Sequence, residues 1–147
     1  MERMTRQREA VLGALSDAAR PLSPAEILAA AQGGVPSLGL STVYRNIRAL
    51  VEEGMLSAVE LPGQPDRYEV VAVPGTVVHR HYFQCLSCDR VFPLEGCPGH
   101  LDEITPPGFV VEQHELTLRG RCAACAKAAG KRAAPAARAG AARRAEG

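Results

Sequence analysis

The chain has 147 residues, of which 46% are apolar and 22% charged, and its formal net charge is +1. This composition is typical of a globular protein with one core or two small ones. No stretch reaches the roughly 18 apolar residues of a membrane span, so we expect no membrane partner. Because no apolar signal region follows the charged N-terminus, we expect a cytoplasmic protein. In that compartment, paired cysteines more often bind metal than form disulfides.

Three helices are predicted in the N-terminal half. The first starts at Thr5, where TRQREAVLGALSDAA places apolar residues at helical spacing. In SPAEILAAA, Ser23 is the expected N-cap of the second helix, with Pro24 at its first position and a glutamate three residues after the cap. The third helix is predicted from Ser41, as its cap, to a C-terminal signal at Gly54. Its expected buried stripe consists of Val43, Ile47, Leu50 and Val51.

A β-hairpin is expected after these helices, because MLSAVEL and RYEVV are rich in strand residues and PGQPD between them is a turn. Three helices followed by a hairpin form a winged helix-turn-helix, which we assign to residues 1–72. Residues 73–77 contain proline and glycine and are predicted to form a hinge linker.

The second half, residues 78–126, is predicted to be a small α/β domain, which makes the whole chain α+β. VVHRHYFQC and FVVEQHELTLRG are the expected strands, and a short helix is predicted between Cys97 and Ile104. Residues 127–147 contain six basic side chains against one acidic one and no large apolar residue. This basic tail is predicted to be disordered.

Four of the five cysteines form two CxxC pairs, namely Cys85, Cys88, Cys122 and Cys125. One pair follows a predicted strand and the other ends the last strand. If the sheet brings them together, four thiolates complete the tetrahedral set of a structural zinc site. The alternatives are a thioredoxin-like redox pair and unrelated buried cysteines. The remaining Cys97 is expected to be a small buried residue rather than a reactive thiol or an additional ligand.

All four histidines lie in the second half: His79, His81, His100 and His114. On a strand, residues i and i+2 face the same side, so His79 and His81 can reach one ion. Imidazole nitrogens suit zinc, copper, nickel or cobalt better than manganese. Spacing alone does not show that all four converge, and exposed or core histidines remain the alternative.

Several motifs occur in the order found in a known family. From about Thr5 to Lys127, the segments LSPAEIL, LSTVYRNIRALVEEGML, RYEVV, the HxH stretch running into CLSC, GFVVEQHELTLRGRC and CAAC resemble the ferric-uptake regulator family of bacterial metal-dependent repressors. The resemblance implies a winged-helix DNA-binding domain, a C-terminal dimerisation domain and a regulatory metal site at the hinge.

The resemblance also implies roles for individual residues. The four paired cysteines match the structural zinc ligands, and all four histidines fall on positions of the regulatory site. A second regulatory site is not expected, because Arg80 and Tyr82 occupy its histidine positions. Of the ligands that this site has in other family members, only one has a possible counterpart here, Glu69. This weighs against the peroxide-sensing branch, and an imidazole-rich site resembles most the zinc-uptake regulators. Tyr44 and Arg45 are the implied base or phosphate contacts, and Ser41 and Thr42 on the same helix are further expected DNA contacts. Arg6, Arg8 and Arg48 are expected to touch phosphates, with a solvated helix face as the alternative, above all for Arg6 and Arg8.

The resulting prediction is a homodimeric, metal-responsive repressor that binds a double-stranded DNA operator. Zinc is expected to be the structural ion, and zinc or another divalent transition metal the corepressor at metal-uptake genes. An iron-, manganese-, peroxide- or redox-responsive regulator of the same family is the alternative. A zinc hydrolase is a distant one, because four histidines around one ion leave no position for water.

Overall fold

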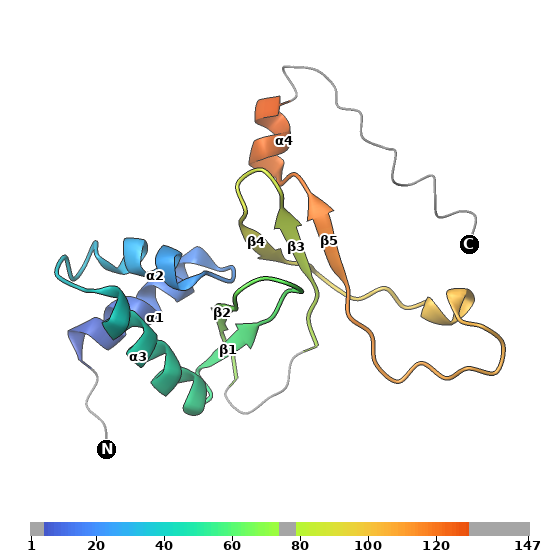
Figure 1. Cartoon of the computed structure of the whole chain (residues 1–147), viewed down its shortest axis with the longest axis horizontal. Coiled ribbons are helices and arrows are strands. Elements are labelled where there is room, and N and C mark those ends of the chain that lie inside the picture. The colour runs from blue at the N-terminus through green and yellow to red at the C-terminus, as the bar shows by residue number, and fades with distance from the viewer. Residues whose placement is uncertain (1–4, 74–78, 130–147) are drawn as a thin grey trace.

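The computed structural model describes residues 5–73 and 79–129. Helices α1 (Arg6–Ala18), α2 (Pro24–Ala31) and α3 (Leu40–Glu52) pack together, and the hairpin β1 (Leu56–Val59) and β2 (Arg67–Val70) lies beside them (Figure 1). A second layer contains β3 (Tyr82–Cys85), β4 (Val91–Pro93), the 3-10 helix η1 (Leu101–Ile104), β5 (Thr117–Gly120) and α4 (Ala123–Ala129). The chain is therefore α+β, as predicted. Most of the expected linker and of the expected disordered tail lies outside the described residues.

Local capping signals fix the starts of the first two helices. The Thr5 hydroxyl accepts a hydrogen bond from the backbone N–H of Arg8 at 3.1 Å. At α2, the Ser23 hydroxyl accepts from the backbone N–H of Glu26 at 3.2 Å, and the Glu26 carboxylate accepts from the backbone N–H of Ser23 at 2.9 Å. This reciprocal pair confirms the predicted capping box, in which two otherwise unpaired helix donors are satisfied.

The start of α3 differs from the prediction. Gly39 is the N-cap, and its carbonyl accepts from the backbone N–H of Val43 at 3.1 Å, so Ser41 lies in the first turn and is not the cap. The prediction failed because a glycine can take the extended cap conformation without a side-chain hydrogen bond. The predicted C-terminal signal at Gly54 is confirmed, because Gly54 follows the helix and has a left-handed φ of 80°.

The helical layer has one apolar core. Its buried members are Val11, Ala14, Leu15, Ile27, Ala31, Val43, Ile47 and Leu50 from the helices, Leu22 and Leu38 from the connections, and Leu56 from the hairpin. Val51, predicted to belong to the buried stripe of α3, is 37% exposed. It lies in the last turn of α3 and lines a groove with Tyr44 and Tyr68. The other three residues of the predicted stripe, Val43, Ile47 and Leu50, are buried in the core as expected.

The hairpin is the wing of a winged helix-turn-helix. Its strands pair antiparallel with Leu56 opposite Val70, and Leu22 forms a two-way backbone bridge with Tyr68 at 2.9 Å in each direction. This bridge attaches the wing to the connection between α1 and α2. Movement of the wing is therefore shared with the helical layer.

The second sheet has the strand order β4-β3-β5, with β3 antiparallel to β4 and parallel to β5. Both long predicted strands are shorter than expected, because pairing starts only at Tyr82 and at Thr117. His79, His81 and His114 therefore lie in irregular segments that precede the strands. No helix in the described part of the chain is long and apolar enough to cross a bilayer.

Candidate metal centres and DNA-reading face

The first candidate centre is formed by the two CxxC pairs. The sulfur atoms of Cys85, Cys88, Cys122 and Cys125 all lie within 4.8 Å of one another. Strand β3 ends at Cys85 and β5 pairs with it in parallel, with Gly120 opposite Cys85. The second CxxC pair, which begins two residues after Gly120, is thereby placed beside the first. We call this group the cysteine centre.

The electrostatics of the cysteine centre suit a divalent cation. Backbone N–H groups of Cys88 and Cys122 donate to the Cys85 sulfur at 3.4 and 3.3 Å, and these hydrogen bonds lower the pKa of Cys85 to about 6. Hydrogen bonding to the neighbouring sulfurs of Cys122 and Cys85 raises the pKa of Cys125 to about 12. The neighbouring sulfurs therefore oppose ionisation of the Cys125 thiol. A bound Zn²⁺ would remove that opposition and is the ion such a sulfur set holds.

The second candidate centre contains three of the four predicted histidines and one residue that was not predicted. His79, His81, Cys97 and His114 place their ligand atoms within 4.8 Å of one another. Nε2 of His114 lies 3.1 Å from Nε2 of His79, 3.0 Å from Nε2 of His81 and 3.0 Å from Sγ of Cys97. We call this group the histidine–cysteine centre.

These separations are close to, and slightly shorter than, those of neighbouring ligands around one ion. With Zn–N of about 2.0 Å and Zn–S of about 2.3 Å, tetrahedral angles place adjacent ligand atoms about 3.3–3.5 Å apart. His81 is 2% exposed, and its burial, followed by the nearby His79 and His114, lowers its pKa. Neutral imidazole is the form that binds metal, so the environment of His81 favours the ligating state.

His100 does not join this group. Its side chain is 83% exposed, and its Nδ1 lies 4.0 Å from a carboxylate oxygen of Glu103, beside η1. Cys97 takes part instead, and the prediction that it is a small buried residue is wrong, because Cys97 is exposed. Gly96, with φ of 108°, turns the chain immediately before Cys97. The one sequence feature that could have indicated a ligand role for Cys97 is that it belongs to neither CxxC pair.

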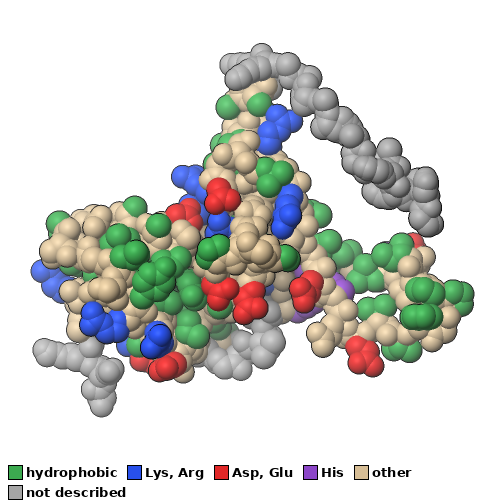
Figure 2. Space-filling model, in the orientation of Figure 1, with side chains coloured by type: hydrophobic (Ala, Val, Ile, Leu, Met, Phe, Trp, Pro, Cys, Tyr) green, Lys and Arg blue, Asp and Glu red, His purple; other side chains and the backbone are tan. Residues whose placement is uncertain are grey.

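The expected DNA-reading face lies on α3. Tyr44 is 51% exposed, and Arg45 and Arg48 are exposed on the same helix, with Arg45 Nη2 3.4 Å from the hydroxyl of Thr42. Basic side chains, all of them arginines in this half of the chain, are visible on this part of the surface (Figure 2). Of the other expected contacts, Ser41 and Arg6 are exposed and Thr42 is half-buried.

Arg8 is placed differently from the other expected DNA contacts. Its guanidinium donates to both carboxylate oxygens of Glu53, in one case at 3.0 Å, and its side chain is only 11% exposed. The pair connects α1 to the end of α3. Arg8 therefore fits a phosphate contact least well among the expected residues.

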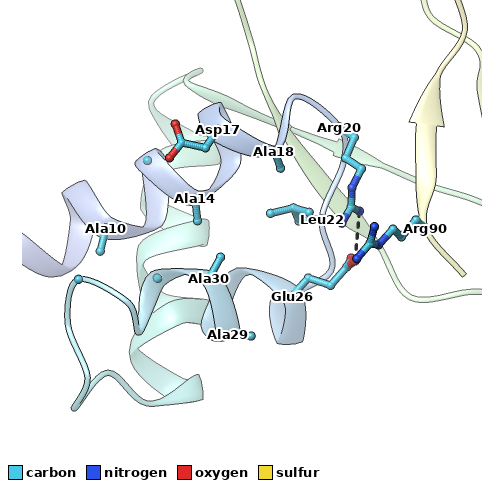
Figure 3. Close-up of a pocket in the computed structure, with 13 residues that line it drawn as sticks. Ala10, Ala14, Asp17, Ala18, Arg20, Leu22, Glu26, Ala29, Ala30 and Arg90 are labelled. Carbon is cyan, nitrogen blue, oxygen red and sulfur yellow. Dashed lines mark hydrogen bonds and ion pairs between the residues drawn. The ribbon is translucent and has the colours of Figure 1, made fainter. Parts of the chain in front are cut away.

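A groove of about 680 Å³ lies between α1 and α2 and is lined mainly by alanine and glycine (Figure 3). At one end Arg20 and Glu26 form an ion pair at 3.1 Å, with Arg90 beside them. No histidine or cysteine of the described chain lines this groove. It therefore adds nothing to the two metal centres.

A winged helix carried beside two sulfur- and imidazole-rich centres defines a metal-responsive transcriptional regulator. The comparisons with known proteins agree. The model of the ferric uptake regulator family matches residues 2–119, and the chain belongs to this family. Its members are DNA-binding regulators and not enzymes, which excludes the zinc hydrolase alternative.

The names of individual relatives refer to different signals, namely peroxide, manganese and zinc. The peroxide operon regulator of Bacillus subtilis (strain 168) is 30% identical over 130 residues, covering 85% of each chain. A zinc-bound manganese uptake regulator has a similar fold, with a TM-score of 0.66, 22% identity and coverage of 82% of this chain and 91% of the other. A zinc uptake regulator complexed with zinc and DNA has a TM-score of 0.55, with 25% identity and coverage of 87% and 86%.

Proposed function

We propose that this chain is a zinc-responsive repressor, in which zinc at the histidine–cysteine centre is the corepressor at metal-uptake genes. The observation that carries the proposal is the donor set: three imidazole nitrogens and one thiol sulfur within 4.8 Å. Soft sulfur and imidazole donors favour zinc, whereas manganese favours carboxylate oxygen. Among the described residues no carboxylate belongs to either centre. The donor chemistry therefore favours zinc over an iron or manganese signal.

The two centres have separate roles in this proposal. Cys85, Cys88, Cys122 and Cys125 hold a permanent zinc that joins β3 to the segment after β5. A set of four thiolates closes the coordination sphere and suits a structural ion. His79, His81, Cys97 and His114 hold the exchangeable zinc. His79 follows directly after the segment between the two halves, so this ion would restrict how they are held.

The working unit is a homodimer on a double-stranded DNA operator in the cytoplasm. Support comes from apolar side chains that the single chain leaves in water: Ile104 is 82% exposed, Phe109 68% and Val110 80%. These residues lie on the arm formed by η1 and the segment before β5 (Figure 1). An apolar surface of this kind typically marks a protein interface. A two-fold partner would cover it and place two α3 helices for two half-sites.

On α3, Tyr44 and Arg45 are the proposed base contacts and Arg48 a proposed phosphate contact, and Arg6 at the start of α1 is a second proposed phosphate contact. Ser41 and Thr42, near the start of α3, complete the DNA-facing surface. Helix N-terminal residues reach base edges in this arrangement. The zinc ion acts indirectly, by favouring the relative position of the halves that fits the operator.

The test is a metal titration of DNA binding. A duplex selected from random sequence in the presence of zinc serves as the probe, with fluorescence anisotropy as the readout. We expect about 5- to 150-fold tighter binding when zinc fills the second site, which is the usual range of allosteric coupling. Manganese at the same free concentration should have little effect. DNA binding that is insensitive to zinc but responds to manganese or iron would contradict the zinc assignment.

A further inference from the structure

Arg80 lies between two members of the histidine–cysteine centre and contacts the wing. Its neighbours in sequence are His79 and His81, whose Nε2 atoms face the centre. Its guanidinium extends elsewhere, and Nη1 donates to a carboxylate oxygen of Glu69 at 2.7 Å. Glu69 belongs to strand β2 of the wing. One tripeptide therefore carries two candidate ligands and an ion pair to the DNA-binding half.

The environment of Glu69 makes its carboxylate sensitive to the loss of that ion pair. Glu69 is only 9% exposed, and its second carboxylate oxygen accepts a hydrogen bond from the hydroxyl of Tyr82. Burial, together with this hydrogen bond to Glu69, raises the pKa of Tyr82, so the phenol stays a donor. A partly buried carboxylate that loses its cation is left with an uncompensated charge. The position of Arg80 therefore affects how stably the wing is held against the second half of the chain.

The wing is also attached, at a second place, to residues beside the cysteine centre. Arg67 Nη2 donates to the carboxylate of Asp89 at 3.0 Å, and Gln64 and Gln84 exchange hydrogen bonds at 2.7 and 2.8 Å. Asp89 directly follows Cys88, and Gln84 directly precedes Cys85. An apolar cluster of Val59, Leu61, Val91 and Tyr82 lies at the same junction. The Arg67–Asp89 and Gln64–Gln84 contacts involve neighbours of the cysteine centre and none of the histidines.

The wing is in turn connected to the reading helix. The backbone N–H of Val71, just after β2, donates to the carbonyl of Met55 at 2.9 Å. Met55 donates to the carbonyl of Leu50 in α3 at 2.9 Å. A shift of β2 against the second half is therefore passed to α3 through backbone hydrogen bonds rather than through a flexible loop.

We propose that Arg80 is the positioning residue that transmits metal occupancy of the histidine–cysteine centre to the wing, through its ion pair with Glu69. This inference rests on the proposed function, because it assumes that the centre holds an exchangeable ion. With the ion bound, His79 and His81 are fixed and the backbone between them holds the guanidinium against Glu69. Without it, the tripeptide is free to shift and the ion pair is lost in part. The Arg67–Asp89 attachment persists in both states.

The experiment compares full-length variants in two readouts: zinc affinity of the second site, by chelator competition, and DNA affinity with and without zinc. In Arg80→Gln we expect zinc affinity in the absence of DNA to stay within about threefold, while the zinc-induced gain in DNA affinity falls by about tenfold or more. Arg80→Lys keeps the charge and should restore part of the gain. Asp89→Asn, the matched control at the other attachment, should weaken DNA binding equally with and without zinc.

Three results would overturn the inference. The first is an unchanged zinc-induced gain in Arg80→Gln. The second is a loss of zinc affinity in DNA-free Arg80→Gln that accounts for the whole effect, since Arg80 would then act on the ligands. The third is an equal loss of the gain in Asp89→Asn. Failure of the proposed function looks different, because the wild-type protein itself would show no zinc-induced gain.

Discussion

The Sγ atom of Cys97 lies 3.0 Å from Nε2 of His114, although 17 positions separate the two residues in sequence. Cys97 Sγ also lies 3.3 Å from Nε2 of His81 and 3.5 Å from Nε2 of His79. A single sulfur at such distances from three imidazole nitrogens occupies the place of a fourth ligand. His100, which the family resemblance implied for this role, has its Nδ1 4.0 Å from a carboxylate oxygen of Glu103 instead.

Two substitutions separate these alternatives. Cys97→Ser replaces a soft thiolate by a poor ligand and should lower the zinc affinity of the exchangeable site by about tenfold or more, since even loss of a ligand's supporting partner costs 10- to 100-fold. His100→Ala should leave the affinity unchanged. Chelator competition measures both, and cobalt bound at this site, with zinc kept in the cysteine centre, should give a thiolate-to-metal absorption band that Cys97→Ser abolishes. The reverse pattern would restore His100 as the ligand.

The cysteine centre should be required for folding of the second half. Cys122→Ser removes one of four ligands and breaks the link between β3 and the segment after β5. We expect the second half's thermal transition to be lost and both zinc ions to be released, because the histidine–cysteine centre lies in the same half. Cys97→Ser is the control, because it should spare the ion of the cysteine centre. A fully folded Cys122→Ser protein without the tightly bound zinc would show that the sheet stands without the metal.

The sequence predicted best those features that depend on near neighbours. The capping box at Ser23 and Glu26 spans three residues, and the wing follows from two short strand patterns around one turn, so local rules suffice. The pairing of the CxxC units was also expected, because both follow strands. The identity of the fourth member of the histidine–cysteine centre was not predictable in this way. It depends on how the chain from Gly96 onward folds back, which no local spacing determines.

The histidines also show how a correct grouping can follow from an incorrect local structure. His79 and His81 were placed on a strand, where alternate residues face one side. They lie before β3, because β4 ends opposite Tyr82 and leaves no partner for further pairing. Their convergence is stabilised instead by contacts with Cys97 and His114. Strand length depends on distant pairing partners, which explains the error.

The exposed apolar arm should mediate dimerisation. Val110 is 80% exposed, and burial of such a side chain against a second copy would be blocked by a charge, because an unpaired buried carboxylate is strongly unfavourable. Val110→Asp should therefore convert a dimer into monomers in light-scattering measurements. Val110→Thr, which keeps the shape without the charge, should remain dimeric. An unchanged dimer in Val110→Asp would place the interface elsewhere.

Arg45 and Arg8 should behave oppositely in DNA binding. Arg45 is exposed on α3, and Arg45→Ala should weaken binding to the selected duplex by about 1–3 kcal/mol, the cost of a lost base contact. Arg8 is held by Glu53, so Arg8→Ala should leave DNA affinity and its salt dependence nearly unchanged. Anisotropy titrations at several salt concentrations measure both. A lower salt slope in Arg8→Ala would show that Arg8 leaves Glu53 to contact a phosphate.

Arg8→Ala should instead affect stability in a pH-dependent way. The hydrogen bond and the charge of Arg8 lower the pKa of Glu53 below its ordinary value of 4.5. A carboxyl with a lowered folded-state pKa adds stability above its unfolded pKa, and this is lost as the pH falls through the folded value. Wild type should therefore be more stable than Arg8→Ala at neutral pH, with the difference shrinking as the pH falls below 4.5. Thermal unfolding at several pH values measures it, and Glu53→Gln should remove the same pH-dependent component. A difference that stays constant with pH would mean that Arg8 stabilises α1 against α3 by packing alone.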